Sequence, residues 1–294
     1  MPIFKDRSVL TGITVRQAMQ RAFIRMPLAA PIFLCVRQMI KSKVDIVLVD
    51  NDQGEPEGVV SKTDIMGAFY AGLPQETCLG DIMMGPVQIC WTDEPIEQTL
   101  DAMKQSCIHQ IYAGVPSERK VLGILSYIDI VGLLYRYCRQ CRKSHRYARG
   151  PEKENLPRLR AKEVMTTQVM VCKKTDTLYQ VMDILSIRKL KAIPIVDEAG
   201  LPLGIISKTD LVLAFVHGIS PDSPAEDIMN SPVASCGPDV LLSHVILKMF
   251  VTDIQHLFVL DSYLERIQGV VSLSDAARFR SGTCRACNAS RAFD

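Results

Sequence analysis

Four short stretches of the chain place a serine three residues before an aspartate, directly after a glycine and two aliphatic residues. The aspartates are Asp64, Asp129, Asp210 and Asp275. The aliphatic pair suits the end of a buried strand, and the residues after each aspartate have the apolar spacing of a helix. Serine is a good N-cap, and the first helical turn leaves N–H groups unpaired. The turn therefore offers donors and a helix dipole to an anion, and its carboxylate can accept hydrogen bonds from hydroxyl groups such as those of a ribose.

These stretches recur at two fixed intervals. Asp64 and Asp129 are 65 residues apart, as are Asp210 and Asp275, and 146 residues separate Asp64 from Asp210. The chain is thus a duplicated pair of duplicated units. Each unit has the pattern of a short opening helix followed by β-α-β-β-α, which predicts the α+β fold class.

The repeats set the expected domain boundaries. We expect repeat one in residues 1–75, repeat two in 76–141, a basic linker in 142–160, repeat three in 161–219, repeat four in 220–280 and a cysteine-containing C-terminal tail in 281–294. The linker is rich in arginine and lysine but has no folded groove with interleaved aromatics. This favours a solvated hinge over a nucleic-acid site.

Elements within repeat three illustrate the predictions. The pattern indicates a strand over Val169–Cys172, a helix over Leu178–Arg188 and a strand over Lys191–Asp197. Helices after the serine turns are expected to begin at the aspartates, as at Asp64 and Asp275.

Composition places the chain among globular proteins. Of its 294 residues 48% are hydrophobic and 22% charged, with a net charge of +2, so the overall charge gives no argument for a nucleic-acid or membrane partner. The N-terminus lacks the apolar run of a signal peptide, and Met26–Val36 is too short to span a membrane. We therefore expect a cytoplasmic protein. Six of the ten cysteines stand singly among apolar residues, and we expect most of them in the core.

The repeated pattern resembles the CBS-domain family, named for cystathionine β-synthase. The resemblance rests on Val164-Met-Thr-Thr167, on Ala192-Ile-Pro-Ile-Val-Asp197 and on the fourfold glycine-to-aspartate turn. In that family two repeats form a pseudo-twofold pair called a Bateman module. The resemblance implies two such modules packed as a disc, as a monomeric disc or a homodimer, with a regulated protein partner that the sequence does not identify.

The resemblance also implies a ligand and its site. Family members commonly sense AMP, ADP, ATP or S-adenosylmethionine in clefts between paired repeats. By resemblance the four aspartates would hold ribose hydroxyls, and ribose or phosphate would be contacted by Ser61, Thr63, Ser126, Ser207, Thr209, Ser272 and Ser274. The backbone around Val169, Met170, Ile193 and Pro194 would frame the adenine.

The four turns differ in charge. Lys62 and Lys208 place a cation between serine and aspartate, where repeats two and four have Tyr127 and Leu273. Arg188, Lys189 and Lys191 add charge in repeat three. Our hypothesis is that repeats one and three bind nucleotide best. The alternative, that serine and aspartate only cap the helix, carries equal weight for repeats two and four.

Two Cys-x-x-Cys pairs follow the last helix of each half. Cys138 and Cys141 lie 146 residues before Cys284 and Cys287, so the pairs occupy matching positions. If the modules pack head to head, four thiolates could form a tetrahedral site for zinc or, as a second choice, for an iron–sulfur centre. Nearby Arg139, Arg142 and Arg285 would favour thiolates; His145 as a ligand is weakened because its counterpart is Arg291.

Free thiols, two local disulfides and a redox pair remain alternatives for these cysteines. A redox pair is disfavoured because it needs the motif at a helix N-terminus, whereas here the motif follows a helix.

Three functions follow from these observations. The first is a non-catalytic sensor of adenosine-containing nucleotides, and the second is a metal- or redox-responsive regulator that uses the four cysteines. The third, an enzyme, is the weakest, since the repeats occupy the chain and no catalytic set of residues stands apart from them.

Overall fold

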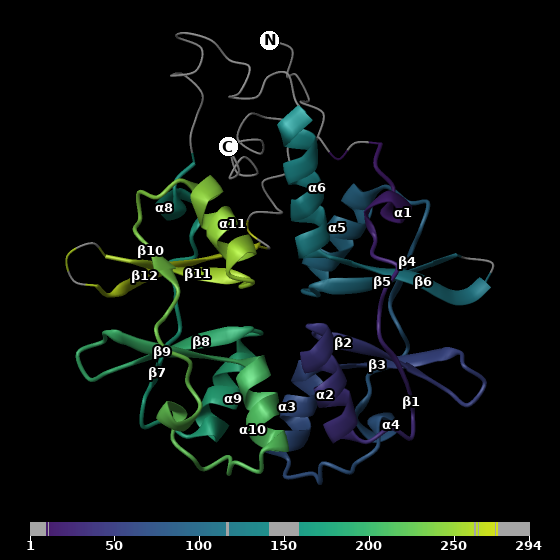
Figure 1. The fold of residues 1–294 in the computed structure, drawn as a ribbon, viewed down its shortest axis with the longest axis horizontal. Coiled ribbons are helices and arrows are strands. Elements are labelled where there is room, and N and C mark those ends of the chain that lie inside the picture. The colour runs from purple at the N-terminus through teal and green to yellow at the C-terminus, as the bar shows by residue number, and fades with distance from the viewer. Residues whose placement is uncertain are drawn as a thin grey trace.

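The computed structural model describes residues 10, 12–115, 118–140, 159–261, 263, 265–273 and 275, with the backbone alone for residues 118–119 and 134–140. These residues form four repeats of similar architecture, arranged two by two (Figure 1). None of the helices within the described ranges is long and apolar enough to cross a membrane.

The first half of the chain holds repeats one and two, which we call module 1. Repeat one consists of α1 (Val15–Ala18), β1 (Arg25–Pro27), α2 (Ile32–Ser42), β2 (Ile46–Asp50), β3 (Pro56–Ser61) and α3 (Lys62–Tyr70). Repeat two consists of α4 (Leu79–Ile82), β4 (Ile89–Trp91), α5 (Ile96–Gln105), β5 (Gln110–Val115), β6 (Glu118–Ser126) and α6 (Tyr127–Gln140).

The second half holds repeats three and four, which we call module 2. Repeat three consists of α8 (Ala161–Val164), β7 (Cys172–Lys173), α9 (Leu178–Ile187), β8 (Ala192–Val196), β9 (Pro202–Ser207) and α10 (Lys208–Val216). Repeat four consists of the 3-10 turn η1 (Ala225–Asp227), β10 (Ser235–Cys236), α11 (Leu242–Val251), β11 (His256–Leu260) and β12 (Ile267–Ser272).

Each repeat builds its own three-stranded sheet. The first strand pairs parallel with the middle strand, and the third pairs antiparallel with it, as in β1, β2 and β3. Middle strands are the most buried, since Val47, Leu48 and Val49 are inaccessible to solvent. The α+β class expected from the repeated pattern is therefore confirmed.

The helices after the serine turns begin earlier than we expected. The α3 helix starts at Lys62 and α10 at Lys208, directly after the capping serines, rather than at the aspartates. The reason is that each serine is the N-cap, so its aspartate falls in the third helical position and completes a capping box.

The strand expected over Val169–Cys172 is shorter in the structure. Only Cys172 and Lys173 form β7, paired with Ile195 and Val196 of β8. Residues 169–171 precede this pairing and belong to no strand.

The opening helix of each repeat packs on the other repeat of its module. Leu79 of α4 lies in a hydrophobic core with residues of repeats one and three, and Val15 of α1 lies in the core formed by repeats two and four. A methionine follows each opening helix and contacts the glycine of the facing serine turn. These contacts pair Met19 with Gly123, Met83 with Gly58, Met165 with Gly269 and Met229 with Gly204. The glycine of the motif is thus required by a close approach of the neighbouring repeat.

Substituting Gly123 by alanine should destabilise the fold. A Cβ atom there would lie 2.5 Å from the Gln20 carbonyl oxygen and 2.8 Å from the Met19 sulfur. We expect a loss of about 1–3 kcal/mol, seen as a lower urea midpoint. The control is Gly67→Ala inside α3, where a Cβ meets nothing within 4 Å. It should stabilise by about 0.5–1 kcal/mol, and equal losses in both variants would contradict this account of the motif.

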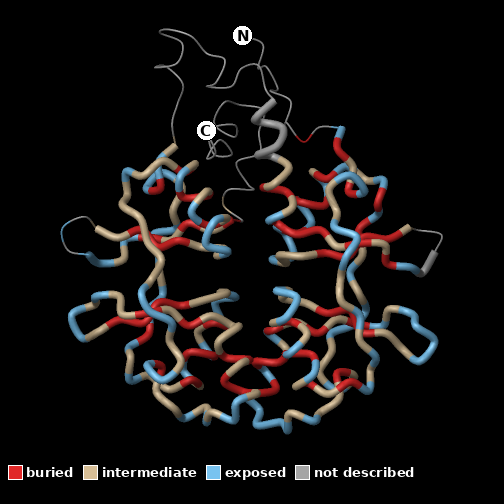
Figure 2. Tube along the Cα trace, viewed as in Figure 1, coloured by how far each residue is buried: buried red, intermediate tan, exposed pale blue. Residues whose placement is uncertain are grey.

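The two modules pack head to head. Repeat one lies beside repeat three, where α3 and α10 are in contact, and repeat two lies beside repeat four (Figure 1). One hydrophobic core joins repeats one and three and a second joins repeats two and four. Figure 2 shows the first of these as buried segments that run across the lower half of the disc, above the exposed loops at its edge. A single chain thus forms the disc of four repeats that the sequence predicts.

Candidate functional site

A cavity of about 290 Å³ lies between the repeats of module 2 and reaches the centre of the disc. Repeat three supplies its opening segment and the approach to β8, namely Thr166, Gln168, Val169, Met170, Lys189, Leu190, Lys191, Ala192 and Pro194. Repeat four supplies Gln255, His256, Phe258, Val270, Ser272, Leu273 and Asp275. Repeat two of the other module closes one end with His109, Gln110, Ser126, Tyr127 and Ile128.

All four serine turns have the same local geometry. In the turn of repeat four, the Ser272 backbone N–H and hydroxyl donate to Asp275 Oδ2 at 2.9 and 2.6 Å. The turns of Asp64, Asp129 and Asp210 repeat this pattern with distances between 2.5 and 2.8 Å. Helix capping is therefore present at every turn, and any ligand contact would be an additional role of the same carboxylate.

Two of the aspartates accept a hydrogen bond from the opening segment of the other repeat in their module. The Gln20 amide donates to Asp129 Oδ1 at 2.5 Å, and the Asn230 amide donates to Asp210 Oδ1 at 2.7 Å. Beside Asp275 the facing segment begins with Thr166, which is shorter than glutamine.

Most of the residues expected around the adenine lie near the serine turn of the paired repeat and not near that of their own repeat. Val169, Met170 and Pro194 of repeat three line the cavity together with Ser272 and Asp275 of repeat four, away from Asp210 of their own repeat. Ile193 points elsewhere, because it is fully buried in the core shared with repeat one. Ser274 lies outside the described residues.

Lys62 and Lys208 contact the opposite module. Lys62 Nζ donates to Thr209 Oγ1 at 2.9 Å, and Lys208 Nζ donates to Thr63 Oγ1 at 2.7 Å, so the two contacts are related by the pseudo-twofold axis. Burial lowers the pKa of Lys208 and raises that of Asp64. The four side chains fasten repeat one to repeat three, and none of them lines the cavity.

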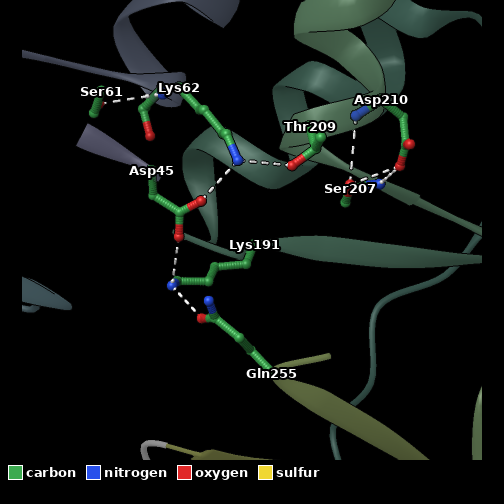
Figure 3. Close-up of polar contacts among 9 residues, drawn as sticks. Asp45, Ser61, Lys62, Lys191, Ser207, Thr209, Asp210 and Gln255 are labelled. Carbon is green, nitrogen blue, oxygen red and sulfur yellow. Dashed lines mark hydrogen bonds and ion pairs between the residues drawn. The ribbon is translucent and has the colours of Figure 1, made fainter. Parts of the chain in front are cut away.

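A charged network connects this contact to the cavity (Figure 3). Asp45 accepts hydrogen bonds from Lys62 at 2.8 Å and from Lys191 at 3.2 Å, and Lys191 also donates to the Gln255 side chain at 2.6 Å. Burial alone would raise the pKa of Asp45, but the two ammonium groups lower it to about 2. Asp45 therefore stays ionised and holds Lys191 at the cavity wall.

Lysine and histidine side chains line the part of the cavity near the disc centre. Lys189 and Lys191 bring positive charge, and the first turn of α6 reaches the wall through Tyr127 and Ile128. Burial lowers the pKa of His256 to about 4, with Lys191 adding to the shift, so this ring is neutral at pH 7. Such an end suits an anionic group.

Sequence reasoning singled out Lys191 but missed the other three residues at the disc centre, which are Asp45, Gln110 and His256. Asp45, Gln110, Lys191 and His256 each stand nineteen residues before the aspartate of their own turn. Each begins or precedes a middle strand, where a buried apolar residue would be usual. The recurrence of a polar residue at this position in all four repeats could have predicted that the repeats meet around a polar centre.

The expected metal site lies largely outside the described residues. Cys141, Cys284 and Cys287 are among those not described, and of Cys138 only the backbone in α6 is. Within the described residues no group of three or more His, Cys, Asp or Glu side chains could hold a metal ion.

The six single cysteines divide by burial, so the core placement we expected for most of them holds for half. Cys35, Cys90 and Cys172 are buried, and burial raises the pKa of each thiol to about 12. Cys78 and Cys236 are partly buried and Cys107 is exposed.

Comparisons with known proteins agree with this architecture. The family model of the CBS domain matches residues 15–71, 79–136, 161–217 and 225–282. The uncharacterized protein MJ1225 of Methanocaldococcus jannaschii is 21% identical over 212 residues, which are 71% of this chain and 73% of that protein.

Solved structures show the same fold. The crystal structure of MJ1225 superposes with a TM-score of 0.75 at 17% identity, covering 91% of this chain and 99% of the other. An uncharacterized conserved protein of Pyrococcus horikoshii gives a TM-score of 0.57 at 19% identity, over 90% of this chain and 99% of the other.

Proposed function

The chain belongs to the CBS domain family, and on that premise we propose that it is a non-catalytic regulatory protein that binds one adenosine nucleotide in the cavity of module 2. The observation that carries the proposal is the cavity itself, which combines an apolar slot, a serine–aspartate turn and a basic end. An adenosine phosphate has three matching parts: a flat base, a ribose with hydroxyl groups and an anionic phosphate.

The outer part of the cavity suits the nucleoside. Val169, Pro194 and Phe258 offer apolar surface for a flat base, and Asp275 stands beside them. A carboxylate has about four lone-pair sites, so Asp275 can accept hydrogen bonds from ribose hydroxyls in addition to those of its cap. The cavity volume of about 290 Å³ is close to the lower limit of the roughly 300–1,000 Å³ that is usual for small-molecule sites.

The inner part of the cavity favours phosphate over other groups. Lys189 and Lys191 lie at this end, together with the first turn of α6. Positive charge attracts a phosphate and repels the sulfonium of S-adenosylmethionine. We therefore propose AMP, ADP or ATP as the ligand.

Regulation would follow from where the ligand sits. The cavity walls come from both modules, and Lys191 is held by Asp45 of repeat one. A phosphate that competes for Lys191 would weaken a contact between the modules and change their packing. The M. jannaschii protein of the same fold is described as a candidate archaeal homolog of g-AMPK, a description consistent with such a role.

Titration calorimetry of the full chain with AMP, ADP, ATP and S-adenosylmethionine tests the proposal. We expect saturable binding of adenosine phosphates to one site, at least about tenfold tighter than binding of S-adenosylmethionine, which corresponds to 1.4 kcal/mol. GDP serves as the control for the base. Absence of binding by every adenosine compound would refute the proposal.

A further inference from the structure

The place in module 1 that corresponds to the cavity is packed with larger side chains. Residues 146 positions apart are equivalent in the two modules, so Phe23 corresponds to Val169, Ile46 to Ala192 and Tyr112 to Phe258. Each residue of module 2 in these pairs lines the cavity, and each counterpart in module 1 is larger.

These larger side chains pack against one another. The Phe23 and Tyr112 rings meet edge to face with their centroids 5.8 Å apart. Tyr112 is 2% exposed and belongs to a small hydrophobic cluster against which Phe23 and Ile46 pack. The Tyr112 hydroxyl is also buried there, without a hydrogen-bond partner among the described residues.

A polar contact closes the same place from the other side. Gln20, the counterpart of Thr166, donates its amide to Asp129 Oδ1 at 2.5 Å. Asp129 corresponds to Asp275, so the carboxylate expected to hold a ribose is engaged by a side chain of its own module.

We propose that the cleft at Asp129 in module 1 is a closed counterpart of the nucleotide site. Its nucleoside position is filled by the side chains of Phe23, Ile46 and Tyr112, and its carboxylate is hydrogen-bonded by Gln20. Of these two equivalent clefts, only the one at Asp275 then binds a nucleotide, and Phe23 is the residue that excludes it from the cleft at Asp129. This inference rests on the proposed function for the identity of the ligand. The closure itself rests on packing alone.

Reciprocal exchange of the equivalent residues tests the proposal. Val169→Phe in module 2 should lower the affinity for ADP at least about 30-fold, because a phenyl ring takes the space of the base. The combined variant Gln20→Thr, Phe23→Val, Ile46→Ala and Tyr112→Phe gives module 1 the residues of module 2 at these four positions. Because Asp45 stands where module 2 has Lys191, the probe for the new cleft is adenosine, which carries no phosphate. Calorimetry with adenosine should then show two sites in place of one.

Three outcomes would overturn the proposal: two ADP sites in the wild-type protein, unchanged affinity in Val169→Phe, or one adenosine site in the combined variant while its original site keeps wild-type affinity. That retained site also shows that the variant is folded. If the combined variant does not fold, the stoichiometry of the wild type and the affinity of Val169→Phe decide the matter.

Thermal unfolding without ligand separates this inference from the proposed function. Phe23→Val should lower Tm by about 4 °C because it removes packed atoms, whereas Val169→Phe should not lower Tm because it fills a cavity. If wild-type protein binds no adenosine compound, the proposed function fails and these two shifts still test the closure. Equal losses of Tm in both variants would contradict it.

Discussion

Replacing Asp275 by alanine is expected to lower the affinity for ADP about 100-fold. The carboxylate lines the cavity and accepts a hydrogen bond from Ser272, and in our proposal it also accepts from the ribose hydroxyls. Hydrogen bonds to a charged group contribute about 1.5–3 kcal/mol each, and 1.4 kcal/mol is a tenfold change in affinity. Titration calorimetry with ADP measures the loss directly.

The matched control is Asp129→Ala in module 1. Asp129 makes the same capping contacts to Ser126, so both variants should lose about 1 kcal/mol of stability from the cap. Only Asp275→Ala should also lose affinity, because Asp129 faces Gln20 and packed side chains. An equal loss of affinity in both variants would mean that the effect comes from the cap and not from the cavity.

Replacing Asp45 by alanine is expected to give the largest loss of stability. It leaves the Lys62 and Lys191 ammonium groups, with side chains 10% and 27% exposed, without their shared counter-ion. Removing one partner of a fully buried pair costs about 3–5 kcal/mol, and partial exposure at this site reduces the expected loss to about 2–3 kcal/mol. The same variant frees Lys191, so its affinity for ADP should rise about threefold if Lys191 meets the phosphates.

Urea unfolding at several pH values distinguishes this network from an ordinary surface pair. The folded pKa of Asp45 is about 2, below its ordinary 3.8, so the unfolded chain is protonated first as the pH falls. The stabilisation is complete above the ordinary pKa and is lost as the pH falls towards 2, a loss that Asp45→Ala should abolish. Asp239, whose partner Lys162 is half exposed, is the control, and its alanine variant should lose far less stability because solvent screens the pair. Similar losses in both variants would argue against a role for the network.

The serine turns could be predicted from sequence because their determinants are local. A glycine, two aliphatic residues, a capping serine and an aspartate three residues later define a strand end, an N-cap and a capping box without reference to the rest of the chain. The fourfold spacing then defines the repeats, whereas their pairing and the disc are expected only from the resemblance to the CBS-domain family. The head-to-head arrangement needed for the disc is present in the structure (Figure 1).

The composition of the cavity could not be predicted, because each cleft takes its walls from different repeats. Val169 and Met170 belong to the same repeat as Asp210, yet their segment crosses to the paired repeat. There it lines the cavity together with Asp275. Identical spacing in every repeat gives no sign of this exchange. Likewise Lys62 and Lys208 stand next to the motif in sequence, while their side chains reach across to Thr209 and Thr63 of the opposite module.

The difference in side-chain size between the two equivalent clefts could be recognised in the sequence only after the structure had shown which residues line each cleft. In the sequence, Phe23 and Val169 are simply different apolar residues at equivalent positions. The structure shows that Val169 lines the cavity, so the larger Phe23 reduces the space at the same place in module 1. The duplicated architecture has thus kept four capped turns while the side chains around them diverged. Capping preserves the fold at each turn, and the surrounding volume determines whether a ligand has room.

A crystal structure of the full chain grown with ADP is the most direct test of the account. We predict one nucleotide in module 2, with its ribose on Asp275, its base against Val169 and Phe258, and its phosphates towards Lys189 and Lys191. Module 1 should show Phe23 and Tyr112 packed together as they are without ligand. A nucleotide bound at Asp64, Asp129 or Asp210, with none at Asp275, would contradict the account.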